Sequence, residues 1–221
     1  MNPHLRFDVD FILRHLPDFI PAVTLALQIF SVSLIAGLVL GVLLAIARLS
    51  RTTLSWFAGM YIEVYRNTPL LVQLYFVFFG LPVVGIIFSP FMSGVIALGA
   101  QHAAFFAEIL RGNIQAVSRT QQEAALALGM MPRTAMRLVI LPQAIRNAIP
   151  AMGSQFVLLL HDTSLVSTIG ILEITLQGRT LAERSAASLE MFVAVGAIYL
   201  LLSAILSLAM RGVEQAYRYI R

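Results

Sequence analysis

Few residues of the chain combine the side-chain types and spacing that catalysis needs. Ser154, His161 and Asp162 could supply a nucleophile, a base and a residue that orients the base. However, Ser154 and His161 lie seven residues apart in one apolar segment, and no Gly-x-Ser-x-Gly turn surrounds the serine. The chain has no cysteine and no lysine, which excludes thiolate nucleophiles, Schiff-base lysines and the lysine of a P-loop. The four histidines show no metal-ligand spacing. An enzyme or an ATPase site within this chain is therefore disfavoured.

The composition indicates an integral membrane protein. Of the 221 residues, 59% are hydrophobic and only 12% are charged, whereas a soluble domain usually carries about 25% charged residues. A helix needs about 20 apolar residues to cross the hydrocarbon core. Long uncharged runs at 22–47, 67–107 and 191–210 therefore predict membrane spans. The middle run is long enough for two spans, near 68–86 and 91–110, because glycines and prolines at 80–90 favour a turn.

The remaining apolar segment is shorter and less regular. Residues 147–161 include Pro150 and Gly153, so we predict a fourth span that is bent, or completed by flanking residues such as Ile140 and Leu141. Residues 163–172 are expected to form a re-entrant segment or a helix near the outer surface. The predicted fold class is thus an all-α membrane protein with about five spans, forming one transmembrane domain over 1–221 with its core at about 20–215.

The distribution of arginine predicts the orientation, because cytoplasmic loops carry an excess of basic residues. With the N-terminus outside, the inner segments 48–66, 111–146 and 209–221 hold eleven of the fifteen arginines. The opposite orientation would place these arginines outside. We therefore expect an external N-terminus and a cytoplasmic C-terminus.

The stretch QQEAALALGMMPRTAMRLVILPQ at 121–143 lies in the largest predicted cytoplasmic connection, at about 118–142. Residues 123–128 favour a helix, Gly129 could cap its C-terminus, and Pro132 could begin a second short element. This connection could be a solvated amphipathic loop that helps to set the topology. It could equally be a docking helix for a soluble partner.

The same stretch resembles the EAA signature of the permeases of ABC importers. Glu123-Ala124-Ala125 is followed after three residues by Gly129, and after nine more by Val139-Ile140-Leu141-Pro142, where valine replaces the usual isoleucine. The segments YRNTPLLVQLYFVFFGLP (65–82), AEILRGNIQAV (107–117), LPQAIRNAIPAMGSQF (141–156) and HDTSLVSTIG (161–170) also resemble the polar amino-acid uptake permeases.

This resemblance implies a type I importer fold in the bacterial inner membrane, with two permease subunits that are identical or different. A separate ATPase dimer would bind ATP and Mg, and a periplasmic or lipid-anchored binding protein would deliver the amino acid. The permease itself would bind no cofactor or metal and would not be an enzyme. The residues implied in coupling to the ATPase are Glu123, Ala124, Ala125, Gly129, Leu141 and Pro142.

Polar residues within predicted spans are candidates for the substrate path, because burying them in lipid is costly. The candidates are Thr68, Gln73, His102, Gln155, Asp162, Thr163 and Ser164. Structural alternatives exist for several of them. Asn67 or Thr68 could cap the start of the second span, and His102 could form a hydrogen bond between helices. Glu108 and Arg111, three residues apart, could form a structural ion pair.

Gln155 bears on the substrate. Family members that look specific for cationic amino acids often carry glutamate at this position, and a neutral amide cannot offset a buried cation. This departure favours an acidic or amide amino acid as the substrate. A basic amino acid such as arginine or histidine is one alternative, and an ion-coupled secondary transporter is an alternative from another class. Arg179 or Arg184 could attract an anion outside, or could lie in a solvated loop.

Overall fold

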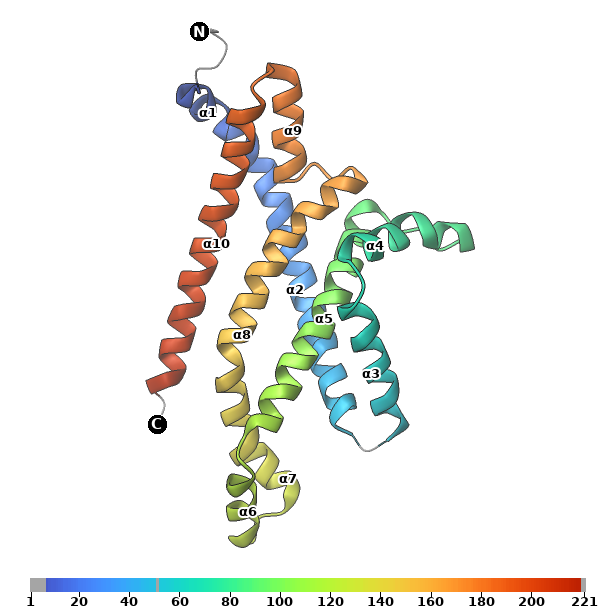
Figure 1. The fold of residues 1–221 in the computed structure, drawn as a ribbon, viewed down its shortest axis with the longest axis vertical. Helices are drawn as coiled ribbons and strands as arrows, with labels where there is room; N and C mark the ends of the chain where they lie inside the picture. The colour runs from blue at the N-terminus through green and yellow to red at the C-terminus, as the bar shows by residue number, and fades with distance from the viewer. Residues whose placement is uncertain (1–6, 51, 220–221) are drawn as a thin grey trace. The chain divides into compact units, whose positions relative to one another are not determined.

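The computed structural model describes residues 7–50 and 52–219, and within these ranges the chain is helical, without a strand (Figure 1). Three helical segments are long and apolar enough to cross a membrane: Val9–Leu49, Pro90–Ala116 and Ser188–Tyr217. Two broken helix pairs raise the number of candidate spans to five in the part of the chain that the structure describes. The predicted all-α membrane fold with about five spans is confirmed.

The chain forms two compact units. Unit 1 comprises 1–33, 70–98 and 158–205, and unit 2 comprises 34–69, 99–157 and 206–221. Four long helices contribute residues to both units: α2 (Ile20–Leu49), α5 (Pro90–Ala116), α8 (Leu141–Asp162) and α10 (Ser188–Tyr219). The single transmembrane domain inferred from the sequence stays a prediction.

Unit 1 contains several shorter helices and an apolar cluster. The shorter helices are α1 (Val9–His15), η2 (Leu16–Phe19), α4 (Leu70–Tyr75), η3 (Phe76–Gly80), η4 (Leu81–Val84), η6 (Thr163–Ile169) and α9 (Ile174–Ser185). Of these, α1, η2 and α9 contribute to the cluster. Phe19, Ile174 and Met191 are fully buried in the cluster. The backbone of α9 lies close to α10, since a Cβ at Gly178 would lie 2.2 Å from Val195 Cγ2.

A buried carboxylate begins α9. Glu173 is fully buried, and its side chain accepts the backbone N–H groups of Thr175 at 2.9 Å and Leu176 at 3.1 Å. Tyr199 Oη on α10 donates to the other oxygen of Glu173 at 2.8 Å. The side chain that caps α9 thus also links α9 to α10 within unit 1. It provides an acceptor for two N–H groups that have no partner within the helix.

Unit 2 contains α3 (Thr53–Arg66), α6 (Arg119–Ala127), α7 (Pro132–Ala135) and η5 (Met136–Ile140). Its core depends on close contact between α2 and α5. A Cβ at Gly37 would lie 3.1 Å from the Gly99 carbonyl oxygen, and one at Gly41 would lie 2.8 Å from Phe106 Cβ. Small residues four apart let transmembrane helices approach closely, and this contact is of that kind.

Two π-helical turns share one sequence feature. The π turn η3 ends at Gly80, two residues before Pro82, and the π turn η5 ends at Ile140, two residues before Pro142. A proline inside a helix lacks an N–H and clashes with the carbonyl four residues earlier. A wider turn before the proline relieves this clash, and π turns commonly mark such sites.

One expectation about the spans needs correction. The second span was predicted near 68–86, but its helix already begins at Thr53 and is broken at 67–69. Residues 53–66 therefore belong to a helix of this broken pair and not to an inner loop. Helix α3 can belong to a span despite its charged residues, because Ala58 and Ile62 on its apolar face are buried.

The fourth span is longer than its uncharged run. Pro132–Ile169 forms one helical segment that passes through α7, η5, α8 and η6. The expected completion by Ile140 and Leu141 is confirmed, and Pro150 lies inside α8 without ending it.

The close contact between α2 and α5 predicts the effect of a single methyl group. In Gly41→Ala, the new Cβ would also lie 3.0 Å from the Ala103 carbonyl oxygen, which is backbone and cannot move away alone. We expect a loss of about 1–3 kcal/mol of stability from overpacking, measured as a lower melting temperature in detergent. In Gly112→Ala, on α5, the Cβ meets nothing within 4 Å, so this control should melt no lower than the wild type. An unchanged melting temperature for Gly41→Ala would contradict the packing described.

Candidate functional site

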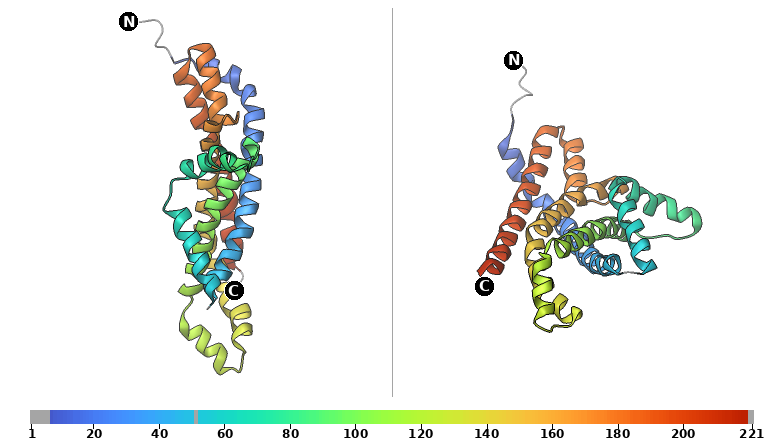
Figure 2. Two further views of the ribbon diagram at one scale, coloured as in Figure 1. Left: turned by 90° about the vertical axis from the view of Figure 1, so that its right-hand side faces the viewer. Right: turned by 60° about the horizontal axis from the view of Figure 1, so that its bottom comes forward.

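The EAA-like stretch folds into a short helical hairpin of α6 and α7 (Figures 1 and 2). Ser118 begins α6 by accepting the N–H of Thr120. At the other end, Gly129 adopts a φ of +81°, its N–H donates to Leu126 O at 2.9 Å, and the Met130 N–H donates to Ala125 O at 3.1 Å. This is the Schellman arrangement, which favours glycine. The predicted capping role of Gly129 is confirmed.

The hairpin presents a mixed polar and apolar surface. Glu123, Ala124 and Gly129 are exposed, whereas Ala125 is buried. Leu128 is 80% exposed and Met131 is 74% exposed. Large apolar side chains so exposed at a loop tip are typical of a surface that binds another protein.

The remaining residues of the EAA-like motif lie beyond the hairpin. Arg133 and Arg137 line a hollow of about 320 Å³ together with Thr134 and Leu138. Leu141 and Pro142 occupy the first turn of α8, where Leu141 is half-buried and Pro142 is exposed. The motif therefore spans the hairpin and the start of the next helix.

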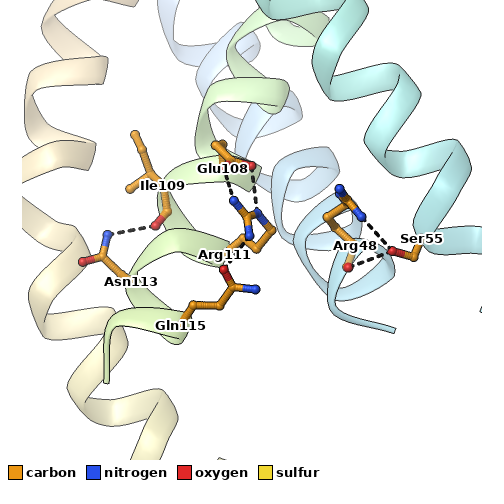
Figure 3. A network of polar contacts seen from close by, with 7 residues as sticks. All are labelled: Arg48, Ser55, Glu108, Ile109, Arg111, Asn113 and Gln115. Atoms are coloured by element: carbon orange, nitrogen blue, oxygen red, sulfur yellow. Dashed lines mark hydrogen bonds and ion pairs between the residues drawn. The ribbon is translucent and has the colours of Figure 1, made fainter. Parts of the chain in front are cut away.

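Polar side chains at the end of α5 bond mainly with one another (Figure 3). Arg111 Nε donates to Glu108 Oε2 at 2.9 Å, and Arg111 also donates to Gln115. Nearby, Arg48 donates to Ser55 at 3.0 Å. The expected ion pair of Glu108 and Arg111 is confirmed, and it compensates both charges locally.

The most buried polar pair of unit 2 joins α5 to α8. Gln155 Nε2 lies 2.9 Å from His102 Nδ1, and the two side chains are 8% and 1% exposed. An amide nitrogen can only donate, so His102 accepts through Nδ1. His102 thus makes the interhelical hydrogen bond that its position suggested.

The other path candidates lie on neighbouring elements. Asp162 is half-buried and ends α8, seven residues after Gln155, which places both on one face of the helix. Thr163 is fully buried and its hydroxyl donates to Leu160 O at 2.7 Å. The carbonyl of half-buried Ser164 accepts the Ser167 hydroxyl at 2.6 Å. Gln73 is half-buried on α4, which contacts η6 in unit 1.

Asn67 and Thr68 have a structural role at the end of α3. The Asn67 amide donates to Glu63 O at 2.8 Å, and the Thr68 hydroxyl donates to Val64 O at 2.8 Å. These bonds satisfy carbonyls at the end of α3, and the cap expected at the start of α4 stays a prediction.

Two of the residues that suggested catalysis, His161 and Ser154, bond to other groups and not to each other. His161 Nε2 lies 2.7 Å from Ser203 Oγ, and Ser154 Oγ donates to Pro150 O at 3.2 Å. Arg179 forms an exposed ion pair with Glu183 on α9. These contacts are not those of a nucleophile and its base.

Sequence reasoning missed two features. Glu173 was not singled out, although an acidic residue directly before a helix is a usual cap. Arg66 was counted among the loop arginines. Its position next to Asn67-Thr68-Pro69, between apolar segments, could have indicated a functional arginine within a span.

Comparison with known proteins decides the family. Residues 37–219 match the family described as "Binding-protein-dependent transport system inner membrane component". The chain belongs to this family of inner-membrane permeases. It is 36% identical to a probable amino-acid ABC transporter permease, y4tG, of Sinorhizobium fredii, over 94% of this chain and 90% of the relative. It is 35% identical to the glutamine transport permease GlnP of Escherichia coli, over 96% and 98%.

A solved structure supports the same assignment. A chain from the crystal structure of an amino acid ABC transporter with histidines shows a TM-score of 0.90 and 34% identity, over 96% of this chain and all of that one. This permease is therefore a multi-pass inner-membrane subunit of an amino-acid ABC importer. It is a transport component and not an enzyme, because a separate ATPase hydrolyses ATP in this family. Membership implies an ATPase and a binding protein as partners, and removes the support for an ion-coupled transporter.

The His102–Gln155 contact predicts energetic coupling between two helices. His102→Leu or Gln155→Leu alone should leave a buried polar group with a lost partner, so each single change should cost more than half of the double change. We expect a coupling energy of about 0.6 kcal/mol, and at most about 1.7 kcal/mol, as such cycles give in membrane proteins. Unfolding of the single and double variants in mixed detergent micelles measures this energy. Additive effects would show that the two side chains do not interact.

Proposed function

We propose that this permease transports an amino acid with an amide or acidic side chain, with its N-terminus outside and its C-terminus in the cytoplasm. The arginine distribution supports this orientation. Arg66 now lies in a helix, but ten of the fifteen arginines still fall in the inner segments, which agrees with the positive-inside rule. Two copies, or one copy and a related permease, would enclose the path.

The observation that carries the substrate class is the neutral polar pair of Gln155 and His102. It is buried in unit 2 and joins α5 to α8. An amide can donate to and accept from the amide or carboxyl group of a substrate, but it supplies no negative charge for a cation. A relative at 35% identity, named a glutamine permease, is in keeping with this proposal.

The wider path would include polar groups on neighbouring elements. Asp162, Thr163, Ser164 and Gln73 would contribute from α8, η6 and α4, and Thr68 from the break after α3. Their half-buried or buried polar atoms are costly in a membrane unless they serve structure or transport. Asp162 is the one observation that favours the second candidate, a basic amino acid, because its carboxylate could balance a cation.

Coupling to the ATPase would occur through the α6–α7 hairpin. Exposed Glu123, Leu128 and Met131 offer one charge and two apolar anchors, and Ala124 permits close approach. Ala125 would act by packing inside the hairpin, and Gly129 by fixing the turn. Leu141 and Pro142 would pass motion from the hairpin into α8. ATP and Mg would bind only to the ATPase subunits.

Exchange of Gln155 for glutamate tests the substrate class. Gln155→Glu adds a negative charge beside His102, so uptake should shift from glutamine or glutamate towards arginine and histidine. We expect the ratio of kcat/KM for arginine over glutamine to rise about 10- to 100-fold, the usual worth of a charge-assisted hydrogen bond. Uptake of labelled amino acids into liposomes that hold permease, ATPase and binding protein measures this ratio.

Gln115→Glu is the control for an added charge on the same unit. Gln115 is exposed at the end of α5, so its exchange should leave the substrate preference unchanged. If wild-type ATP hydrolysis is stimulated by arginine alone, the proposed substrate class is wrong.

Charge reversal in the hairpin tests coupling. Glu123→Lys should abolish ATP-driven uptake because it removes the one acidic group that the hairpin offers to the ATPase. Membrane insertion should stay intact, since Glu123 is exposed. Glu183→Lys, at an exposed side chain of α9, is the matched control and should transport normally. Normal uptake by Glu123→Lys would remove the anchoring role assigned to this residue.

A further inference from the structure

Arg66 occupies the end of a helix that is too short to cross a membrane. Helix α2 ends at Leu49 and α3 begins at Thr53, so the first turn of α3 lies at the membrane face where α2 leaves. The 14 residues of α3 rise about 21 Å, which is less than the roughly 30 Å of hydrocarbon core. Arg66, the last residue of α3, therefore lies within the thickness of the membrane.

Packing inside unit 2 fixes the position of Arg66. Tyr61 Oη on α3 donates to Ala100 O on α5 at 2.9 Å, and the rings of Tyr61 and Tyr65 stack at 4.4 Å. Ile62 is buried against α5 in the same cluster. The helix that carries Arg66 is thus held firmly on α5.

The guanidinium of Arg66 rests on an aromatic ring and has no carboxylate partner among the described residues. Its Cζ lies 5.6 Å from the ring centre of Phe105, and the side chain is exposed. The neighbouring carboxylates have other partners: Glu63 accepts the Asn67 amide at 3.0 Å, and Glu108 pairs with Arg111.

The surroundings of Arg66 indicate an aqueous path. An unpaired guanidinium at this depth does not face lipid, because charged groups within a membrane face a water-filled cavity or another polar group. The Phe105 ring also lies 6.4 Å from the ring of His102, which bonds to Gln155. A single aromatic ring therefore separates the free guanidinium from the buried polar pair.

We propose that Arg66 binds the α-carboxylate of the transported amino acid. This inference rests on the proposed function and adds a second element to it: Arg66 would recognise the group that every amino acid carries, and Gln155 would recognise the side chain. A guanidinium binds a carboxylate through two parallel N–H···O bonds. The cation–π contact with Phe105 restrains the guanidinium and limits the entropy lost on binding.

The test uses the permease–ATPase complex without the binding protein, because that protein would recognise the carboxylate by itself. Isothermal titration with each of the twenty amino acids first identifies one that binds to the wild type. The same titration is then repeated with the α-amide of that amino acid, which lacks the carboxylate. The wild type should prefer the free acid, and Arg66→Gln should weaken its binding about 10- to 100-fold. Arg66→Lys should retain part of the preference.

Controls separate binding from folding. Arg179→Gln removes an exposed arginine from α9 and should leave the affinity and the preference unchanged. Melting temperature and size-exclusion profile show whether each Arg66 variant is still folded and assembled.

The outcomes distinguish this inference from the proposed function. Full affinity and an intact acid preference in Arg66→Gln would overturn the role of Arg66. Dissociation of the complex in this variant would also overturn it, by making Arg66 a contact between subunits. Binding of arginine but not glutamine by the wild type would refute the substrate class alone, and the Arg66 comparison would proceed with arginine and its amide. Absence of binding by any amino acid would refute both.

Discussion

The structure depends on one constraint: backbone N–H and C=O groups in the hydrocarbon core need partners within the protein, because lipid offers none. At the break after α3, Asn67 and Thr68 return their side chains to the carbonyls of Glu63 and Val64. At the start of α9, Glu173 satisfies two backbone N–H groups and a tyrosine hydroxyl. The backbone can be irregular at these points because side chains supply the hydrogen bonds that a continuous helix would make.

The same constraint explains which parts of the fold the sequence could predict. Long uncharged runs identified α2, α5 and α10, because hydrophobicity alone selects a span. Hydrophobicity did not identify α3, because Glu63 and Arg66 interrupt its apolar run. Ala58 and Ile62 of this helix are nevertheless buried. Hydrophobicity also underestimated the fourth span, because Arg137 and Arg146 hid the helical continuity from Pro132 onwards. Helices whose burial is supplied by packing partners leave a weaker trace in hydropathy than helices that face lipid.

The candidate sites divide in a similar way. The hairpin could be predicted in detail because its signals are local: an alanine-rich helix, a glycine with positive φ, and a proline that begins the next helix. Spacing along one helix also found the pair of Glu108 and Arg111. The contact of His102 with Gln155 joins residues 53 positions apart, and the placement of Arg66 on Phe105 joins two helices. Such tertiary contacts follow from packing that no single stretch encodes.

The π turn of η5 has a mechanical consequence. From Pro132 to Gln155 the chain is one helical rod, with the hairpin at its base and the buried amide about 35 Å away at 1.5 Å per residue. One extra residue in the π turn turns every later side chain by about 100° around the rod, as one residue does in an α-helix. With α geometry at this turn, Gln155 would point about 100° away from His102. The π turn therefore sets the direction in which Gln155 points relative to the hairpin.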